Sequence, residues 1–214
     1  MKHLISKSLI ASALAVATGS ALAVGAGDWI VRVGAAHVNP NASSKPFTDI
    51  AANARVDVGS DTQLGLTLAY MVSDNIGIGL LAATPFKHDI KGAGDLAGLG
   101  KIGQTKHLPP TLTLQYHFAP RSDVRPYLGA GINYTNFFSS KTQGLGDTKL
   151  KLDDSWGLAA EAGVDIDIND RWFVSGQLWY LDIDTKAKLT GTTPGNARVS
   201  IDPWVVMIGI GTTF

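Results

Sequence analysis

The sequence predicts an all-β fold: an eight-stranded antiparallel transmembrane β-barrel with short periplasmic turns and four long extracellular loops. Three observations support this prediction. Eight segments alternate between large apolar residues and small or polar ones, over the roughly 9–11 residues that a tilted membrane strand needs. The connections between these segments alternate between short and long. The N-terminus has the pattern of an export signal.

The first four segments each place large apolar side chains on one face, because residues two positions apart in a strand point the same way. These side chains are Trp29, Val31 and Val33; Leu64, Leu66, Leu68 and Tyr70; Ile76, Ile78 and Leu80; and Leu112, Leu114, Tyr116 and Phe118. The opposite face carries mainly glycine, alanine, threonine and glutamine. One face therefore suits lipid and the other a narrow lumen.

The last four segments follow the same pattern with one irregularity. Their apolar faces are Leu128, Ala130, Ile132 and Tyr134; Trp156, Leu158, Ala160, Ala162, Val164 and Ile166; Val174, Leu178 and Tyr180; and Trp204, Val206, Ile208, Ile210, Thr212 and Phe214. Asp182 and Asp184 break the alternation of the seventh segment. We therefore expect a bulge or an exit from the membrane at this point.

The connections have the asymmetry of an outer-membrane barrel. Short turns are expected at residues 73–75, 119–124 and 169–171, which are rich in turn-forming residues. The long connections lie near residues 37–62, 84–110, 135–154 and 184–203 and carry much of the charge. An even number of strands places both ends of the barrel domain on the periplasmic side.

The first 23 residues have the pattern of a secretory signal peptide. Two early lysines are followed by an apolar stretch and then by Ala21-Leu22-Ala23, a small-x-small cleavage site. We expect residues 1–23 to be a signal peptide and residues 24–214 to form one barrel domain. An N-terminal membrane anchor is the alternative, but the stretch is rich in Ala, Gly, Ser and Thr and is weakly apolar for a span.

Composition excludes several classes of protein. The 18 basic and 18 acidic residues balance, so no basic field exists for nucleic acid. The chain has no cysteine, which excludes a disulfide scaffold and thiolate metal sites. Charged residues make up 17% of the chain, below the level of about 25% that is usual in soluble domains.

A soluble eight-stranded barrel of the lipocalin kind is the main competing fold. Such a barrel would carry charges on its outer face, whereas neither face of the predicted strands carries a regular set of charges. Aromatic residues also cluster toward the ends of the apolar faces, as in an interfacial girdle. The membrane barrel is therefore favoured.

Several stretches, in consistent order over most of the predicted mature chain, carry a family resemblance. They are residues 80–86 (LLAATPF), 107–112 (HLPPTL), 125–127 (RPY), 133–138 (NYTNFF), 154–157 (DSWG), 179–185 (WYLDIDT) and 202–205 (DPWV). With them the chain resembles the OmpW family of small barrels in the bacterial outer membrane. The resemblance implies long loops that extend the barrel above the membrane. It also implies a narrow, largely apolar passage for small hydrophobic molecules, with lateral escape into the bilayer through a gap in the wall.

The C-terminal Phe214 resembles the signal by which outer-membrane barrels are recognised for assembly. This resemblance implies two partners besides the small hydrophobic solutes: the barrel assembly machinery and the lipids of the outer membrane.

Leu81 and Trp179 are large apolar residues on the inward phase of the third and seventh segments. The family pattern places an apolar constriction of the channel at these two positions. We expect both side chains to point inward and to approach one another across the lumen. The remaining inward positions include many glycines, for which close curvature of a small barrel and an open lumen are equally good explanations.

Three charged residues, Arg32, Glu161 and Asp165, also lie on the inward phase. An unpaired buried charge is costly, so we expect a paired or solvated polar cluster in the periplasmic half of the lumen. Pro85 and the pair at 109–110 flank the second long connection. Because proline lacks the N–H that a strand ladder needs, Pro85 marks a candidate lateral opening, although these prolines could also simply end strands.

The sequence offers little for catalysis. Paired aspartates occur beside loops, and the scattered histidines, His37, His88, His107 and His117, are not spaced with them as a ligand set. We therefore expect no enzyme activity, cofactor or metal. The leading hypothesis is a channel for passive uptake of small hydrophobic molecules. The alternative is a non-conducting structural or receptor barrel whose extracellular loops bind partners.

Overall fold

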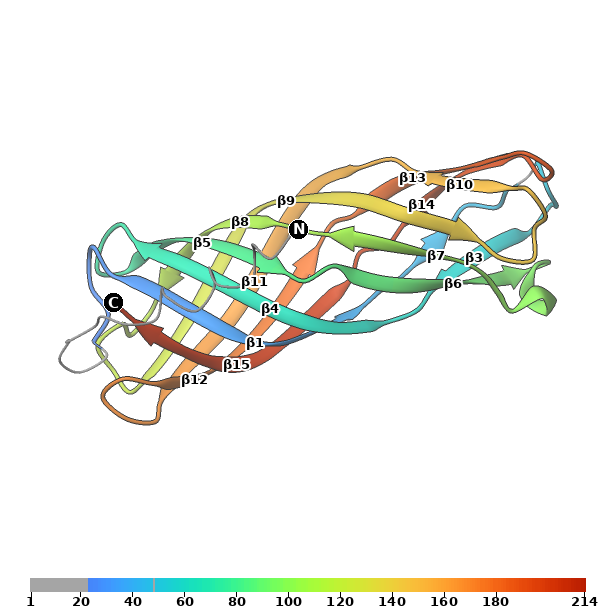
Figure 1. Cartoon of the computed structure of the whole chain (residues 1–214). Helices are drawn as coiled ribbons and strands as arrows, with labels where there is room; N and C mark the ends of the chain where they lie inside the picture. Colours follow the sequence, from blue (N-terminus) through green and yellow to red (C-terminus); the bar gives the residue numbers. More distant parts are fainter. Residues whose placement is uncertain (1–22, 48) are drawn as a thin grey trace, which may run out of the picture.

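The computed structural model describes residues 23–47 and 49–214. The predicted signal peptide lies almost wholly outside the described residues. Eight antiparallel strands close into a barrel, because β15 pairs with β1 and β11 pairs with β9 (Figure 1). In order around the barrel they are β1 (Trp29–Asn39), β4 (Asp61–Met71), β5 (Ile76–Ala83), β8 (Thr111–His117), β9 (Val124–Thr142), β11 (Ser155–Asp167), β12 (Phe173–Leu181) and β15 (Trp204–Thr213). The predicted eight-stranded fold is confirmed.

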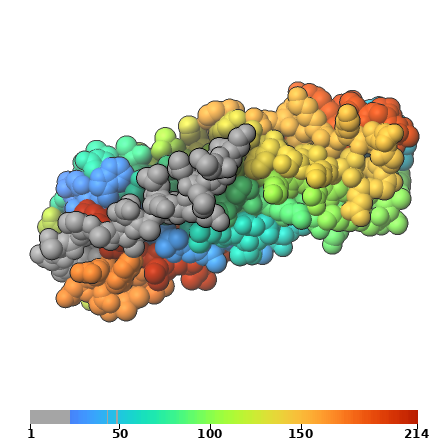
Figure 2. Space-filling view, in the orientation of Figure 1, coloured from blue at the N-terminus to red at the C-terminus, as the bar shows by residue number. Residues whose placement is uncertain are grey.

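The long connections are not irregular loops but largely strands that continue the barrel. They contain β2 (Ser43–Ser44), β3 (Ala54–Val58), β6 (Phe86–Gly94), β7 (Lys101–Leu108), β10 (Lys149–Leu152), β13 (Asp184–Thr190), β14 (Gly195–Ser200) and the short 3-10 helix η1 (Ala97–Leu99). One wall of this extension has the order β9-β7-β6-β3, and the other has the order β10-β13-β14-β2. We call this part the extension. Barrel and extension form one elongated body (Figure 2).

The predicted turns and the predicted irregularity are both present. Residues 73–75, 119–123 and 169–171 link consecutive barrel strands at the end where the C-terminus lies (Figure 1). β12 ends at Leu181 and β13 begins at Asp184, so the break in alternation marks an exit from the barrel wall. No helix in the described ranges is long and apolar enough to cross a membrane.

The two faces of the barrel strands differ as the alternation predicts. In β4, for example, Leu64 and Leu66 are exposed on the outside, whereas Thr67 and Ala69 are buried inside. Aromatic pairs mark both rims of the outer apolar face. The pairs are Trp29–Tyr70 and Tyr116–Phe118 at the periplasmic rim, and Tyr134–Trp156 and Tyr180–Trp204 at the outer rim, with ring centroids 4.7–5.2 Å apart. Such girdles are typical of membrane barrels, where amphipathic rings sit at headgroup level.

At two inward positions, Gly34 and Gly163, neighbouring atoms lie too close for any side chain larger than glycine. A Cβ at Gly34 would lie 2.2 Å from the carbonyl oxygen of Ile208 on the neighbouring strand. A Cβ at Gly163 would lie 2.2 Å from Cζ of Tyr127, whose ring covers the glycine. An open lumen, one of the two explanations for these glycines, is not what these two positions show, since side chains and backbone fill the space beside them.

Phe214 closes the barrel through its backbone and leaves its ring half exposed. Its N–H donates to Trp29 O (2.8 Å) and its carbonyl accepts from Trp29 N (2.9 Å), while the residue is 42% exposed.

We expect Phe214→Ser to lower outer-membrane levels in cells several-fold but to change the unfolding midpoint of the purified, refolded barrel little. Phe118→Ser, another exposed aromatic at the same rim, is the matched control. Equal cellular levels of the two variants would contradict an assembly role for Phe214.

Candidate functional site

The inside of the barrel is layered along its axis, and β1 shows the order of the layers. From the periplasmic end outward, its inward positions are Ile30, Arg32, Gly34, Ala36 and Val38. Ile30 belongs to an apolar cluster at the periplasmic end, Arg32 to a polar layer, and Ala36 and Val38 to a second apolar cluster. A solute that enters from outside would therefore meet apolar side chains first and charged side chains afterwards.

The second apolar cluster contains both predicted constriction residues. Leu81 of β5 and Trp179 of β12 are 4% and 1% exposed, and both pack in one buried cluster with Phe86, Leu181 and Met207, among others. Their side chains therefore point inward, as their phase in the strands predicts. We call this cluster the apolar belt. Its role as a constriction in transport stays a prediction.

The polar layer below the belt is closed by paired charges. Arg32 donates from Nε and Nη2 to the two carboxylate oxygens of Asp165, at 2.9 and 2.6 Å. The guanidinium also lies 4.8 Å from the ring centroid of Tyr127. Glu161 accepts a 2.5 Å hydrogen bond from Gln115 Nε2. Arg32, Asp165 and Glu161 are 0%, 1% and 5% exposed. Arg32 and Asp165 therefore form the expected pair, whereas Glu161 is buried with Gln115 as its hydrogen-bond partner rather than in an ion pair.

Sequence reasoning missed a second ion pair in this layer. Arg125 Nη1 lies 2.6 Å from Asp167 Oδ1, and its guanidinium lies over the ring of Phe173. Arg125 is the second residue of β9 and precedes residues 128–134, whose apolar face marks this strand in the sequence. Its inward phase relative to Tyr127 was the signal that could have identified it, because the two residues are two positions apart.

The wall beside the belt is interrupted at Pro85. The ladder between β5 and β8 ends at Leu81↔Thr111, and the ladder between β6 and β7 begins at Phe86↔His107. Residues 82–85 face residues 108–110 without ladder pairing. On the 108–110 side, the carbonyl of Pro110 accepts from Tyr134 N (3.0 Å) and that of Pro109 from Asn133 Nδ2 (3.2 Å).

A small hollow lies at this interruption. Residues of the belt and of the adjoining wall line about 240 Å³ of space, including the part open to solvent: Ala36, Leu81, Ala82, Ala83, Phe86, Pro109 and Val205. Pro109 and Pro110 supply no N–H to the ladder. Their carbonyl groups accept hydrogen bonds from residues of β9 instead. The sequence itself, through these prolines, therefore prevents ladder pairing at this point of the wall, next to the apolar belt.

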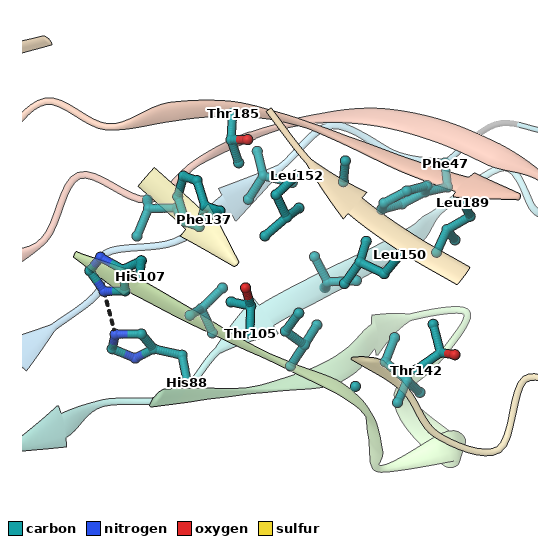
Figure 3. Close-up of a pocket in the computed structure, with 18 of the residues that line it drawn as sticks. Phe47, His88, Thr105, His107, Phe137, Thr142, Leu150, Leu152, Thr185 and Leu189 are labelled. Atoms are coloured by element: carbon teal, nitrogen blue, oxygen red, sulfur yellow. Dashed lines mark hydrogen bonds between the residues drawn. The ribbon is translucent and has the colours of Figure 1, made fainter. Parts of the chain in front are cut away.

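The extension encloses a larger apolar cavity above the belt. About 1010 Å³ of space, including the part open to solvent, lies between its walls. Side chains from both walls line it, among them Phe47, Ile90, Ile102, Leu150, Leu152, Leu189 and Val199 (Figure 3). No lysine, arginine, aspartate or glutamate is among the described residues that line it. The sequence did not predict this cavity, because its walls come from segments expected to be loops.

Two histidines stand at one end of the cavity, next to Phe137 (Figure 3). His88 Nε2 and His107 Nε2 are 2.8 Å apart, and His88 Nδ1 contacts the carbonyl of Gly59. The His107 ring also packs against Phe86 and Phe137, with centroids 5.5 and 5.8 Å apart. Burial and the neighbouring His88 lower the pKa of His107 to about 3, and burial lowers the pKa of His88. Both rings are therefore neutral at pH 7.

The residues of this interior do not form a metal centre of the usual kind. Within the described ranges, no group of three or more histidine, cysteine or acidic side chains is placed to hold a metal ion. The His88–His107 pair supplies two ring nitrogens only, and these already bond to each other.

Comparison with known proteins places this architecture in a known group. The family model described as OmpW family matches residues 25–214. Outer membrane protein W of Vibrio cholerae is 49% identical over 88% of this chain and 89% of its own length. The dibenzothiophene metabolism operon protein PahQ of Pseudomonas aeruginosa is 32% identical over 87% of this chain and 88% of its own. The crystal structure of OprG from Pseudomonas aeruginosa superimposes with a TM-score of 0.85 and 41% identity, covering 91% of this chain and 99% of OprG.

Proposed function

The chain belongs to the OmpW family of outer-membrane barrels, and from that premise we propose that it is a channel for the passive uptake of small hydrophobic molecules. The observation that carries the proposal is that the apolar cavity of the extension borders the apolar belt. Val38 and Ile183 line the cavity and also belong to the belt, and the described lining of the cavity contains no charged residue.

An apolar interior of this kind favours a hydrophobic solute over water. Removing apolar surface from water is worth about 25 cal/mol per Å². A solute the size of a leucine side chain therefore gains about 1.5–3 kcal/mol on entry. That gain is enough to concentrate the solute in the cavity and small enough to let it leave, which conduction requires.

We further propose that the solute leaves sideways, near Pro85. Continuing along the axis would take it from the belt into the layer of Arg32, Asp165 and Glu161, where Arg32 and Asp165 form a buried ion pair and Glu161 is buried and hydrogen-bonded to Gln115. An apolar solute offers these groups no replacement hydrogen bonds, so displacing them would be costly. The wall at residues 82–85, which lacks ladder pairing with residues 108–110, adjoins the belt. Leu81 and Trp179 would form the constriction before this exit.

One relative supports the chemical class of the solute. PahQ is named for an operon of dibenzothiophene metabolism, and dibenzothiophene is a small, apolar aromatic molecule. The matched region spans most of both chains. Uptake of a compound of this class is therefore the first activity to test.

The test compares the rate at which cells take up dibenzothiophene with and without the protein, together with a variant that narrows the belt. We expect uptake to require the protein and Leu81→Trp to lower its rate at least about fivefold. The larger ring fills the belt that the solute must cross, and a barrier higher by about 1 kcal/mol lowers a rate about fivefold. Leu80→Trp is the matched control, since Leu80 is the neighbouring residue and is exposed on the lipid face.

Both variants must reach the outer membrane at wild-type levels for the comparison to hold. Uptake that is the same with and without the protein would reject the channel and favour a non-conducting barrel that acts through its extracellular surface. Equal effects of the two substitutions would reject Leu81 as a constriction residue.

A further inference from the structure

The His88–His107 pair is the polar feature of the cavity that the proposed passage leaves unexplained. The threonine hydroxyls nearby have partners outside the cavity. Thr105 Oγ1 lies 2.9 Å from Ser140 Oγ, and Thr185 Oγ1 donates to Asp153 O at 2.6 Å. Among the described lining residues, His107 Nδ1 is the one buried side-chain nitrogen or oxygen that lacks a hydrogen-bond partner.

The hydrogen-bond chain determines what this atom can do. The carbonyl of Gly59 only accepts, so His88 Nδ1 must carry the proton and donate to it. The neutral His88 ring then has a lone pair at Nε2, and His107 Nε2 must donate across the 2.8 Å contact. His107 Nδ1 is left with a lone pair, in a residue that is 5% exposed.

We propose that His107 Nδ1 is the acceptor for a hydroxyl group on the solute, so that the cavity prefers apolar molecules carrying one hydroxyl, namely alcohols and phenols. This inference rests on the proposed function and adds a substrate class to it. A hydroxyl donates to the lone pair of Nδ1 while the apolar body of the molecule lies against the leucine, isoleucine and phenylalanine side chains of the cavity.

Competing classes of solute match the site less well. An alkane would leave the buried lone pair of His107 Nδ1 without a hydrogen bond. A site with such an acceptor therefore binds an alkane less well than a molecule that carries a hydroxyl group. A carboxylate would bring a charge into a cavity whose described lining holds no cation, and it has no proton to donate to Nδ1 at neutral pH. An ether accepts hydrogen bonds but cannot donate one.

The test uses two isomers with the same atoms, 1-octanol and heptyl methyl ether. The full chain is placed in lipid nanodiscs at pH 7.5, with ¹⁵N-labelled histidine rings and ¹³C-labelled leucine methyl groups. We expect both compounds to shift the methyl signals of Leu150 and Leu189, which report occupancy of the cavity. Only 1-octanol should shift the signal of the unprotonated Nδ1 of His107. The Nδ1 contact should raise the affinity for the alcohol, relative to the ether, by about three- to tenfold.

Variants then test whether this preference depends on the acceptor. His107→Phe keeps an aromatic ring beside Phe86 and Phe137 and should abolish the extra affinity for the alcohol. Thr105→Val is the matched control, because its hydroxyl is engaged by Ser140, and it should leave the preference unchanged.

The outcomes separate this inference from the proposed function. If 1-octanol shifts the leucine methyl signals but not His107 Nδ1, or if His107→Phe keeps the preference, the hydroxyl subsite is rejected while hydrophobic binding stands. If neither compound shifts the methyl signals, the proposed function is rejected and this inference with it. The wild-type ¹⁵N measurement decides the question even where His107→Phe does not fold.

Discussion

Replacing Pro85 with alanine is expected to lower the uptake of hydrophobic solutes about two- to tenfold. Alanine supplies a backbone N–H where the wall between residues 82–85 and 108–110 has no ladder pairing. One added hydrogen bond is worth about 0.5–1.5 kcal/mol, which biases the wall toward closure by about that factor. The measurement is the initial rate of dibenzothiophene uptake by cells, normalised to the amount of folded protein in the outer membrane.

Pro126→Ala is the matched control for this experiment. Pro126 also lies in a barrel strand and is exposed, but it stands opposite Val164 in an intact ladder, so we expect uptake to stay near wild type. Charge changes at Arg32 or Glu161 should likewise have a weaker effect than Pro85→Ala in protein that has folded. Uptake that survives Pro85→Ala but fails when the polar layer is altered would show an axial route instead.

Removing one partner of the buried ion pair should produce the largest loss of stability. Asp165→Ala leaves the guanidinium of Arg32 buried without its carboxylate, at a residue that is 0% exposed. Breaking such a pair costs about 3–5 kcal/mol. We expect the free energy of unfolding, measured by denaturant titration of the refolded barrel in lipid vesicles, to fall by that amount.

Two comparisons show whether burial of the charge causes the loss. The pair Arg121–Asp74 has a similar distance, 2.7 Å, but its side chains are 70% and 49% exposed. Asp74→Ala should therefore cost about 1 kcal/mol or less. The double variant Arg32→Met with Asp165→Leu removes both charges and should be more stable than Asp165→Ala alone. A double variant as unstable as the single one would indicate that lost packing, rather than an unpaired charge, is responsible.

The alternation of side chains was sufficient to predict the barrel and the direction of its site residues. A period of two assigns every residue of a strand to one of two faces. This rule assigns five candidate site residues to the inner face without any knowledge of strand pairing, and all five are buried in the structure: Leu81, Trp179, Arg32, Glu161 and Asp165. The exit of the chain after β12 followed from the same rule, because Asp182 and Asp184 break the period.

The alternation of side chains did not predict the strands of the extension or the cavity between them. Residues 84–110 were expected to form a loop, yet they contain β6 and β7, which pair along their length. Strands outside the membrane carry charges on their solvent face and lack the uniform apolar face of the barrel segments. The cavity then arises between two sheets, so no single segment contains its pattern.

By itself, then, the sequence determined the number of membrane strands, the alternation of short and long connections between them, and the face on which each side chain lies. These are local properties of a chain with a period of two. Only the tertiary structure decided which inward side chains meet. Arg32 and Asp165 are separated by 133 positions, and His88 and His107 come together across a hairpin. The physical reason is that such meetings depend on the stagger and tilt with which strands close into a barrel, and these are properties of all the strands together.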